Sequence, residues 1–342
     1  MPAFVRGGRA ALRRTVVATL VAAAAGLAAP IAHAQKTVEW RYGHMNPPNS
    51  AAGMQAQWLA EAIAKYSNGQ IKVTVYPSSQ LGKLQELAEA VSTGTIALSH
   101  NTAGGIGSLH EPFGALDTPY LYRDVDHLMK VVDVNSPVMS RLNDGLVKAA
   151  GVRVLYAYYF GTRQLTANRA VMQPSDLAGQ KIRAIPFPIY MSTVQGLGAV
   201  PVPVDWSEVP TALATGQVAG QENPVNVVLS SKLYETQSHM MLTSHIMNAQ
   251  LIVINEKAWQ GLSPEMKAAL SKAADEVRTK ATDMVRAQEA EETDKLRGLK
   301  MKVVGPAEGL KLDAFKASVG KVVQDRFGAK FGDLYKEIAA VR

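Results

Sequence analysis

Two arginines and one asparagine carry the most specific chemistry in this sequence. Arg163 follows an apolar, aromatic segment, and Arg183 lies twenty residues later in a short basic segment. A guanidinium stays charged at ordinary pH and offers a planar fork that matches a carboxylate. Asn223 precedes Pro224, which restricts its backbone to extended conformations and fixes where its amide points. Brought to one cleft, the three side chains predict an anionic ligand; the alternatives are surface charges, an ion pair between lobes, and a plain turn asparagine.

Signatures of catalysis and metal binding are missing from the sequence. It contains no H-E-x-x-H, no G-x-S-x-G, no phosphate-binding Walker loop and no cysteine. The histidines are scattered: His239 and His245 are six apart, and His100 and His110 are ten apart, neither of which is a helical ligand spacing. We therefore expect a binding protein with no catalytic residues, no cofactor and no metal. An enzyme acting on a small carboxylic acid is the rival, and it would need a general base beside the arginines.

The first 34 residues are typical of a bacterial secretory signal peptide. Four arginines precede an apolar run over residues 15–29, and Ala32-His33-Ala34 fits the small-x-small rule for cleavage after Ala34. A membrane anchor is the alternative, but the apolar run is shorter than the roughly 20 residues that span a bilayer. The signal peptide predicts that the mature protein functions outside the cytoplasm.

Removing those 34 residues from the 342 leaves 308, enough for two lobes. The formal charge of +7 includes four leader arginines and no leader acids, so the mature chain is near +3. That balance, with no basic cluster, excludes a nucleic-acid partner. The absence of cysteine excludes disulfides and thiolate metal sites.

Alternating apolar segments and helical patterns predict an α/β protein. The expected strands cover residues 38–42, 71–76, 96–99 and 152–160, with another ending near 185. Helices are expected over 52–66 and 81–93, and over 209–214 with Ser207 as N-cap. Ser263-Pro264 begins a periodic run that continues to about Leu296. At about 1.5 Å per residue this helix would be roughly 50 Å long, enough to span both lobes.

Six ordered sequence strings resemble the DctP-type solute-binding proteins of TRAP transporters (tripartite ATP-independent periplasmic transporters). The resemblance covers nearly all of the mature chain, and Gly220 to Pro224 is its most specific part. The strings are Tyr76-Pro77-Ser78-Ser79-Gln80-Leu81-Gly82, Pro119-Tyr120-Leu121-Tyr122-Arg123-Asp124, Gly161-Thr162-Arg163, Asp176 to Arg183, Leu197-Gly198-Ala199, and Thr211 to Pro224.

The resemblance implies a two-lobed, type II-like periplasmic binding protein with one long helix spanning both lobes. It implies an organic acid as ligand and, as partners, the small and large membrane subunits of a sodium-driven TRAP permease; we expect a monomer. Lobe I would comprise residues 35–160 and 249–288, and lobe II residues 161–248 and 289–342. A periplasmic sensor that presents the same acid to a receptor kinase is an alternative.

The resemblance also assigns site residues. Arg183 occupies the position of the carboxylate-clamping arginine, Arg163 that of a second arginine, and Asn223 that of a ligand-contacting asparagine. Trp206 falls where members present an aromatic side chain to the cleft, although core packing would also suit it. Three departures, at Ala97, Pro210 and Ala219, put local hydrogen bonding in doubt.

The identity of the acid depends on the residues around the arginines. Phe187 and Tyr190 follow Arg183 at distances that could wall the cleft, which favours a monocarboxylate with an apolar or aromatic body, or a keto or hydroxy acid, over a polyanion. The segments 44–49 and 100–102 are expected to complete the pocket, with His44, Asn46, His100 and Thr102 as unassigned candidates.

Overall fold

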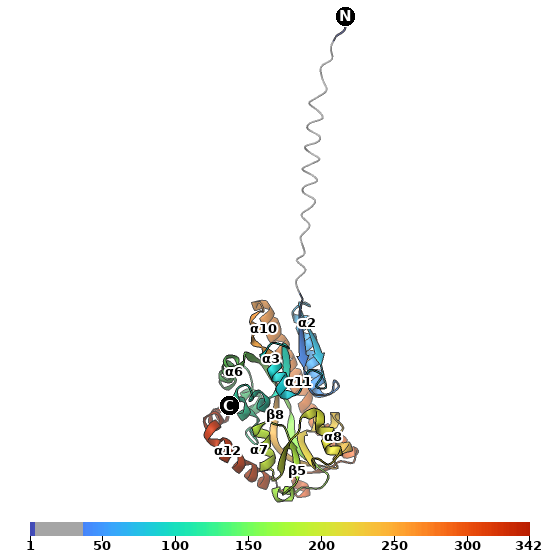
Figure 1. The fold of residues 1–342 in the computed structure, drawn as a ribbon, viewed down its shortest axis with the longest axis vertical. Coiled ribbons are helices and arrows are strands. Elements are labelled where there is room, and N and C mark those ends of the chain that lie inside the picture. The colour runs from blue at the N-terminus through green and yellow to red at the C-terminus, as the bar shows by residue number, and fades with distance from the viewer. Residues whose placement is uncertain (4–36) are drawn as a thin grey trace. The chain divides into compact units, whose positions relative to one another are not determined.

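The computed structural model describes residues 1–3 and 37–342; the predicted signal peptide therefore lies almost wholly outside the described residues. Residues 38–342 form one compact unit with an α/β fold (Figure 1). No helix in the described part of the chain is both long enough and apolar enough to cross a membrane.

One mixed sheet of nine strands organises this unit. The strand order is β2-β1-β3-β8-β4-β7-β5-β6, with β9 pairing β8. The strands are β1 (Val38–Gly43), β2 (Ile71–Tyr76), β3 (Leu98–Thr102), β4 (Val152–Ala167), β5 (Lys181–Ala184), β6 (Val200–Pro203), β7 (Gly220–Pro224), β8 (His239–Asn255) and β9 (Lys302–Val304).

The two long strands β4 and β8 are antiparallel and run through both halves of the sheet. β3 pairs the C-terminal part of β8, whereas β7 pairs the C-terminal part of β4 from Arg163 to Ala167. Their shared register is interrupted near Gly161, where φ is +120° and an added Cβ would lie 2.8 Å from Pro224 Cβ. Only glycine fits this bend without strain, so the chain crosses from one half to the other at a built-in irregularity.

Helices pack around both halves of the sheet. In the view of Figure 1, α2, α3, α6 and α10 lie toward one end of β8, and α7 and α8 lie toward the other. The α-helices are α2 (Ala51–Tyr66), α3 (Leu84–Ser92), α4 (Ala103–Ile106), α5 (Val125–Val131), α6 (Pro137–Ala150), α7 (Pro188–Gly196), α8 (Val209–Ala214), α9 (Val225–Ser230), α10 (Glu256–Gln260), α11 (Pro264–Gly298) and α12 (Leu312–Ala340).

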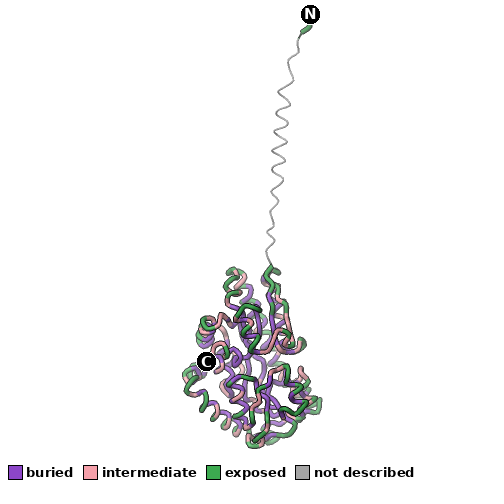
Figure 2. The backbone as a smooth tube through the Cα atoms, in the orientation of Figure 1, coloured by how far each residue is buried: buried purple, intermediate pink, exposed green. Residues whose placement is uncertain are grey.

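The long helix α11 confirms the predicted connection between the lobes. Its N-cap is Ser263, whose hydroxyl accepts a hydrogen bond from the Met266 amide, and the helix runs for 35 residues. Leu270 to Ala281 pack in the core around β1 and α2, whereas Leu296 packs in the core beneath α8. Figure 2 shows buried segments, drawn in purple, in the interior of both halves.

Several expected elements differ from the structure. Ser207 is not the N-cap of α8: Trp206–Glu208 form a 3-10 turn, and α8 begins after Glu208 with Pro210 in its first turn. The strand predicted over 152–160 continues to Ala167 because it pairs along β8, which the sequence analysis did not identify as a strand. The predicted lobe boundaries stay a prediction; the C-terminal part of α12, from Phe327 to Ile338, packs with residues assigned to lobe I.

Candidate ligand-binding site

The two arginines meet at one cavity. Arg163 comes from the bend of β4 and Arg183 from β5, and both side chains are almost completely buried, at 1 % and 2 % exposure. The cavity has a volume of about 30 Å³ and takes residues from both halves of the sheet. It is lined by Met45, Asn46, Leu84, Thr102, Phe160, Arg163, Arg183, Ile185, Trp206, Asn223, Val227 and Gln250.

Arg163 is already paired with a carboxylate. Its Nε donates to Glu222 Oε2 at 2.5 Å, and its Nη2 donates to Glu222 Oε1 at 2.9 Å and to the Glu222 carbonyl at 2.7 Å. Glu222 is fully buried, and although burial alone raises its pKa, Arg163 and His245 together lower that pKa to about 2. A buried, two-pronged pair of this kind leaves Arg163 with little uncompensated charge.

Arg183 has no such partner. Its Nε donates to the Val204 carbonyl at 2.8 Å, its guanidinium carbon lies 5.8 Å from the centre of the Trp206 ring, and its Nη1 makes no hydrogen bond within the described chain. Burial, together with the neighbouring Arg163, lowers the pKa of Arg183 to about 10, although Glu222 acts to raise it. A buried guanidinium with an unused donor is costly unless an anion reaches it.

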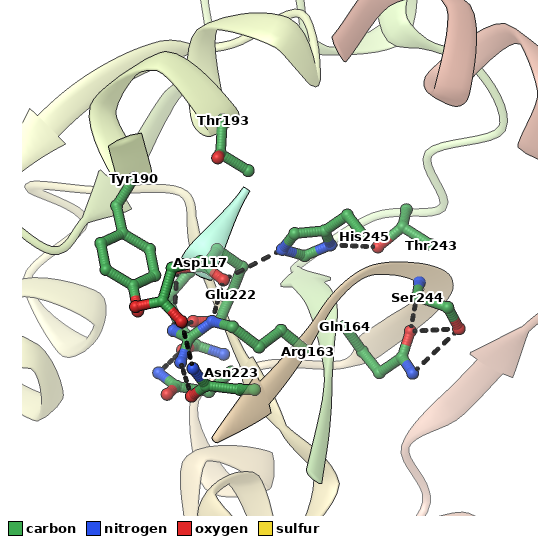
Figure 3. A network of polar contacts seen from close by, with 12 residues as sticks. Asp117, Arg163, Gln164, Tyr190, Thr193, Glu222, Asn223, Thr243, Ser244 and His245 are labelled. Carbon is green, nitrogen blue, oxygen red and sulfur yellow. Dashed lines mark hydrogen bonds and ion pairs between the residues drawn. The ribbon is translucent and has the colours of Figure 1, made fainter. Parts of the chain in front are cut away.

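A buried polar network holds Arg163 in place (Figure 3). His245 contacts Glu222 Oε2 through Nε2 at 3.0 Å, and Asn248 accepts from Arg163 Nη1 at 3.3 Å. Asn248 in turn donates to Asp117 Oδ1 at 2.9 Å, and burial raises the pKa of Asp117 despite that bond. The network ties β4, β7 and β8 to the segment around Asp117, so Arg163 is positioned from four parts of the chain.

Four of the six predicted site residues meet here, and two lie elsewhere. Arg163, Arg183, Asn223 and Trp206 line the cavity. Tyr190 does not line it: its hydroxyl donates to Asp117 Oδ2 at 2.6 Å, and its ring lies 5.3 Å from the Arg163 guanidinium carbon. Phe187 lines a different cavity, with Phe327 and Phe331. Phe187 and Tyr190 therefore do not form the expected aromatic wall, and the aromatic residues that line the cavity are Phe160 and Trp206.

Of the four residues that the sequence left as unassigned pocket candidates, two line the cavity and two do not. Asn46 and Thr102 line the cavity. His44 and His100 are buried elsewhere, with ring centres 5.5 Å apart and no hydrogen bond to any of their four ring nitrogens within the described residues. Burial lowers the pKa of His44 to about 4 and that of His100 well below its usual value, so both are neutral at neutral pH.

Sequence reasoning missed Glu222, His245, Asn248 and Gln250 as parts of this region. Glu222 could have been identified from the sequence, because it directly precedes Asn223 in the same short string. If Asn223 and the two arginines share a cleft, the neighbouring acid is a natural ion-pair partner for one of the arginines. The other three belong to β8, whose mixed polar and apolar residues do not alternate like an ordinary strand. Among the described residues no group of three or more potential metal ligands is found.

Comparison with known proteins gives consistent results. Residues 42–330 match the family described as bacterial extracellular solute-binding protein, family 7. The chain is 32% identical over 308 residues to the 2,3-diketo-L-gulonate-binding periplasmic protein YiaO of Escherichia coli, covering 89% of this chain and 91% of that protein. It is 30% identical over 288 residues to the C4-dicarboxylate-binding periplasmic protein DctP of Rhodobacter capsulatus, covering 83% and 84%.

A solved structure has the same fold. The TRAP periplasmic solute-binding protein of Polaromonas sp. JS666, bound to D-erythronate, superposes with a TM-score of 0.82 at 29% identity, covering 89% of this chain and 98% of that one.

Proposed function

The chain belongs to family 7 of the bacterial extracellular solute-binding proteins, and we propose that it captures an organic acid by its carboxylate and delivers it to a TRAP-type, sodium-coupled permease. The permease would comprise a small and a large membrane subunit. One observation supports the choice of ligand: Arg183 is buried at a cavity, and its Nη1 has no hydrogen-bond partner among residues 37–342.

In this proposal Arg183 is the carboxylate clamp. The fork of Arg183 would take the two carboxylate oxygens, and the Asn223 NH2 group would donate a further hydrogen bond to the carboxylate. Asn223 is oriented by its own amide, which donates to Gln221 Oε1 at 2.5 Å. Arg163, held by Glu222, would assist at the edge of the site, and Trp206 would cover the clamp.

Capture requires the two lobes to separate and close. A volume of about 30 Å³ holds roughly two water molecules, so an acid of four or more carbons needs the walls to move apart. Trp206 and Met45 line both this cavity and a larger outer groove of about 410 Å³, which we take as the entrance. Binding would then favour the closed arrangement by adding contacts that only closure completes.

Lys83 is expected to act as a latch for the closed arrangement. It precedes α3, and its Nζ lies 2.7 Å from Asp205 Oδ2 and 3.0 Å from Glu208 Oε1, both of which precede α8. The substitution Lys83→Ala should weaken acid binding on the order of threefold, because these partly exposed pairs are individually weak. The effect should appear in the dissociation rate and disappear in high salt; an unchanged dissociation rate at low salt would contradict the latch.

Titration calorimetry and mass spectrometry test the proposal together. The protein purified after export should carry or bind a carboxylic acid, and the recovered acid should have an unchanged mass. The cavity lining holds guanidinium, amide and hydroxyl groups but no carboxylate or imidazole to transfer a proton, which supports binding without turnover. Failure of every carboxylate in a broad panel to bind would reject the proposal.

We further propose export to the periplasm and action as a monomer. A native mass spectrum of the exported protein should give one chain per particle, beginning at Gln35. A mass that retains residues 1–34 would reject cleavage after Ala34.

A further inference from the structure

Three polar, uncharged side chains line the cavity from β1, β3 and β8 or from the residues that follow them. Asn46 follows β1, Thr102 ends β3, and Gln250 lies on β8 directly opposite Thr102 in the sheet register. We name these three residues the neutral polar wall. All three are at least nine-tenths buried, with exposures of 5 %, 2 % and 3 %.

Gln250 is the distinctive member of the neutral polar wall. Its Oε1 is buried and makes no hydrogen bond to any described residue. An unsatisfied buried amide loses its hydration without compensation, so its presence at a cavity indicates a ligand group that completes it. A hydroxyl group suits either orientation of the amide, because a hydroxyl donates to the oxygen and accepts from the NH2 group.

The charge balance of the cavity favours hydroxyl groups on the ligand over a second carboxylate. The cavity lining contains two cations, and Glu222 compensates one of them, which leaves the single charge of Arg183 for the ligand. His44 and His100, which do not line the cavity, add no positive charge at neutral pH because burial lowers the pKa of each. A second carboxylate at the neutral polar wall would be desolvated without a cation to balance it.

Resting on the proposed function, we infer that the ligand is a hydroxylated monocarboxylate whose hydroxyl groups meet the neutral polar wall, with Gln250 as a specificity-determining residue. Relatives of the chain fall on both sides of this distinction: one is named for C4-dicarboxylates, and one solved structure holds D-erythronate.

Matched acids provide the test. Four-carbon acids (D-erythronate, butyrate and succinate) and six-carbon acids (D-galactonate, hexanoate and adipate) keep carbon number constant while changing hydroxyl groups and charge. Calorimetry on the wild-type protein should show the hydroxylated acid of at least one set binding at least about tenfold more tightly than both of its counterparts, as expected for one buried hydrogen bond and one uncompensated charge.

The substitution Gln250→Leu should reduce affinity for the hydroxylated acid by about tenfold and leave affinity for the unsubstituted monocarboxylate unchanged. Gln237→Leu is the matched control: Gln237 is equally buried but accepts a hydrogen bond from Thr166 and does not line the cavity, so the acid preference should persist. Gln250→Met serves as a second variant of similar length, and a melting transition verifies that each variant folds.

The outcomes separate this inference from the proposed function. Absence of a preference of at least about tenfold for the hydroxylated acid in both sets would overturn the inference, and it would leave carboxylate capture intact as long as any acid binds. A hydroxyl preference that survives both Gln250 substitutions would overturn the role of Gln250. No binding of any acid would reject the proposed function itself, and the inference with it.

Discussion

Replacing Arg183 with methionine should strongly weaken acid binding and at the same time stabilise the ligand-free protein. The ligand carboxylate would lose its only uncompensated cation, which should weaken affinity by about 2–5 kcal/mol. Without ligand, however, the buried charge of Arg183 destabilises the folded protein. Burial lowers its pKa to about 10, which corresponds to about 3 kcal/mol of unfavourable free energy for the charged form. Calorimetry and urea unfolding of ligand-free protein measure the two effects separately.

Arg163→Met is the matched control for this result. Both arginines are buried and line the same cavity, but Arg163 compensates Glu222, so its removal leaves a buried carboxylate without its main partner. We expect Arg163→Met to lower the free energy of unfolding by about 3–5 kcal/mol, whereas Arg183→Met should raise it. If both variants lost stability equally, or if Arg183→Met kept its acid affinity, the assignment of Arg183 as the clamp would be wrong.

Glu222→Gln should cause the second large change. The substitution leaves two buried guanidiniums at one cavity without the carboxylate that pairs Arg163, which should cost about 3–5 kcal/mol of folding stability. It should also improve the binding of dicarboxylates relative to monocarboxylates, because a second charge becomes available to the ligand. Thermal unfolding and competition calorimetry measure these two outcomes.

The pH dependence of stability gives an independent check on Glu222. Its pKa is lowered from 4.5 to about 2 in the folded protein, so its stabilisation is fully present above pH 4.5 and is lost as the pH falls toward 2. That lowering corresponds to about 3 kcal/mol. Glu222→Gln should flatten this part of the stability curve. Glu291→Gln, which removes an exposed pair with Lys295, should leave the curve nearly unchanged; a wild-type-like slope in Glu222→Gln would contradict the assignment.

Local signals explain what the sequence predicted correctly. Ser263 and Pro264 mark the start of α11 through a side-chain cap and a proline in the first turn, both of which depend only on neighbouring residues. Likewise α2 ends where Asn68 and Gly69 adopt positive φ angles of 51° and 75°. Short strands bounded by such signals, including β1 and β2, agree with expectation within one residue.

Tertiary pairing explains what was missed. β8 has buried polar residues such as His245, Asn248 and Gln250, which are tolerated because they have partners in the network or face the cavity, so the strand lacks an apolar pattern. Likewise the sequence could place two arginines near one cleft but could not decide which of them Glu222 compensates. That decision depends on the pairing of β4 with β7, which joins residues about sixty positions apart.

The passage of β4 and β8 through the whole sheet also determines how far the protein can be divided. Both halves contain part of β4 and part of β8. A fragment that comprised only one half would therefore leave strand edges unpaired. The protein should therefore unfold in a single transition rather than lobe by lobe, and a nick in either long strand should release both halves to proteolysis together. Binding of an acid at the bend of β4 would therefore protect every strand of the sheet against unfolding and proteolysis.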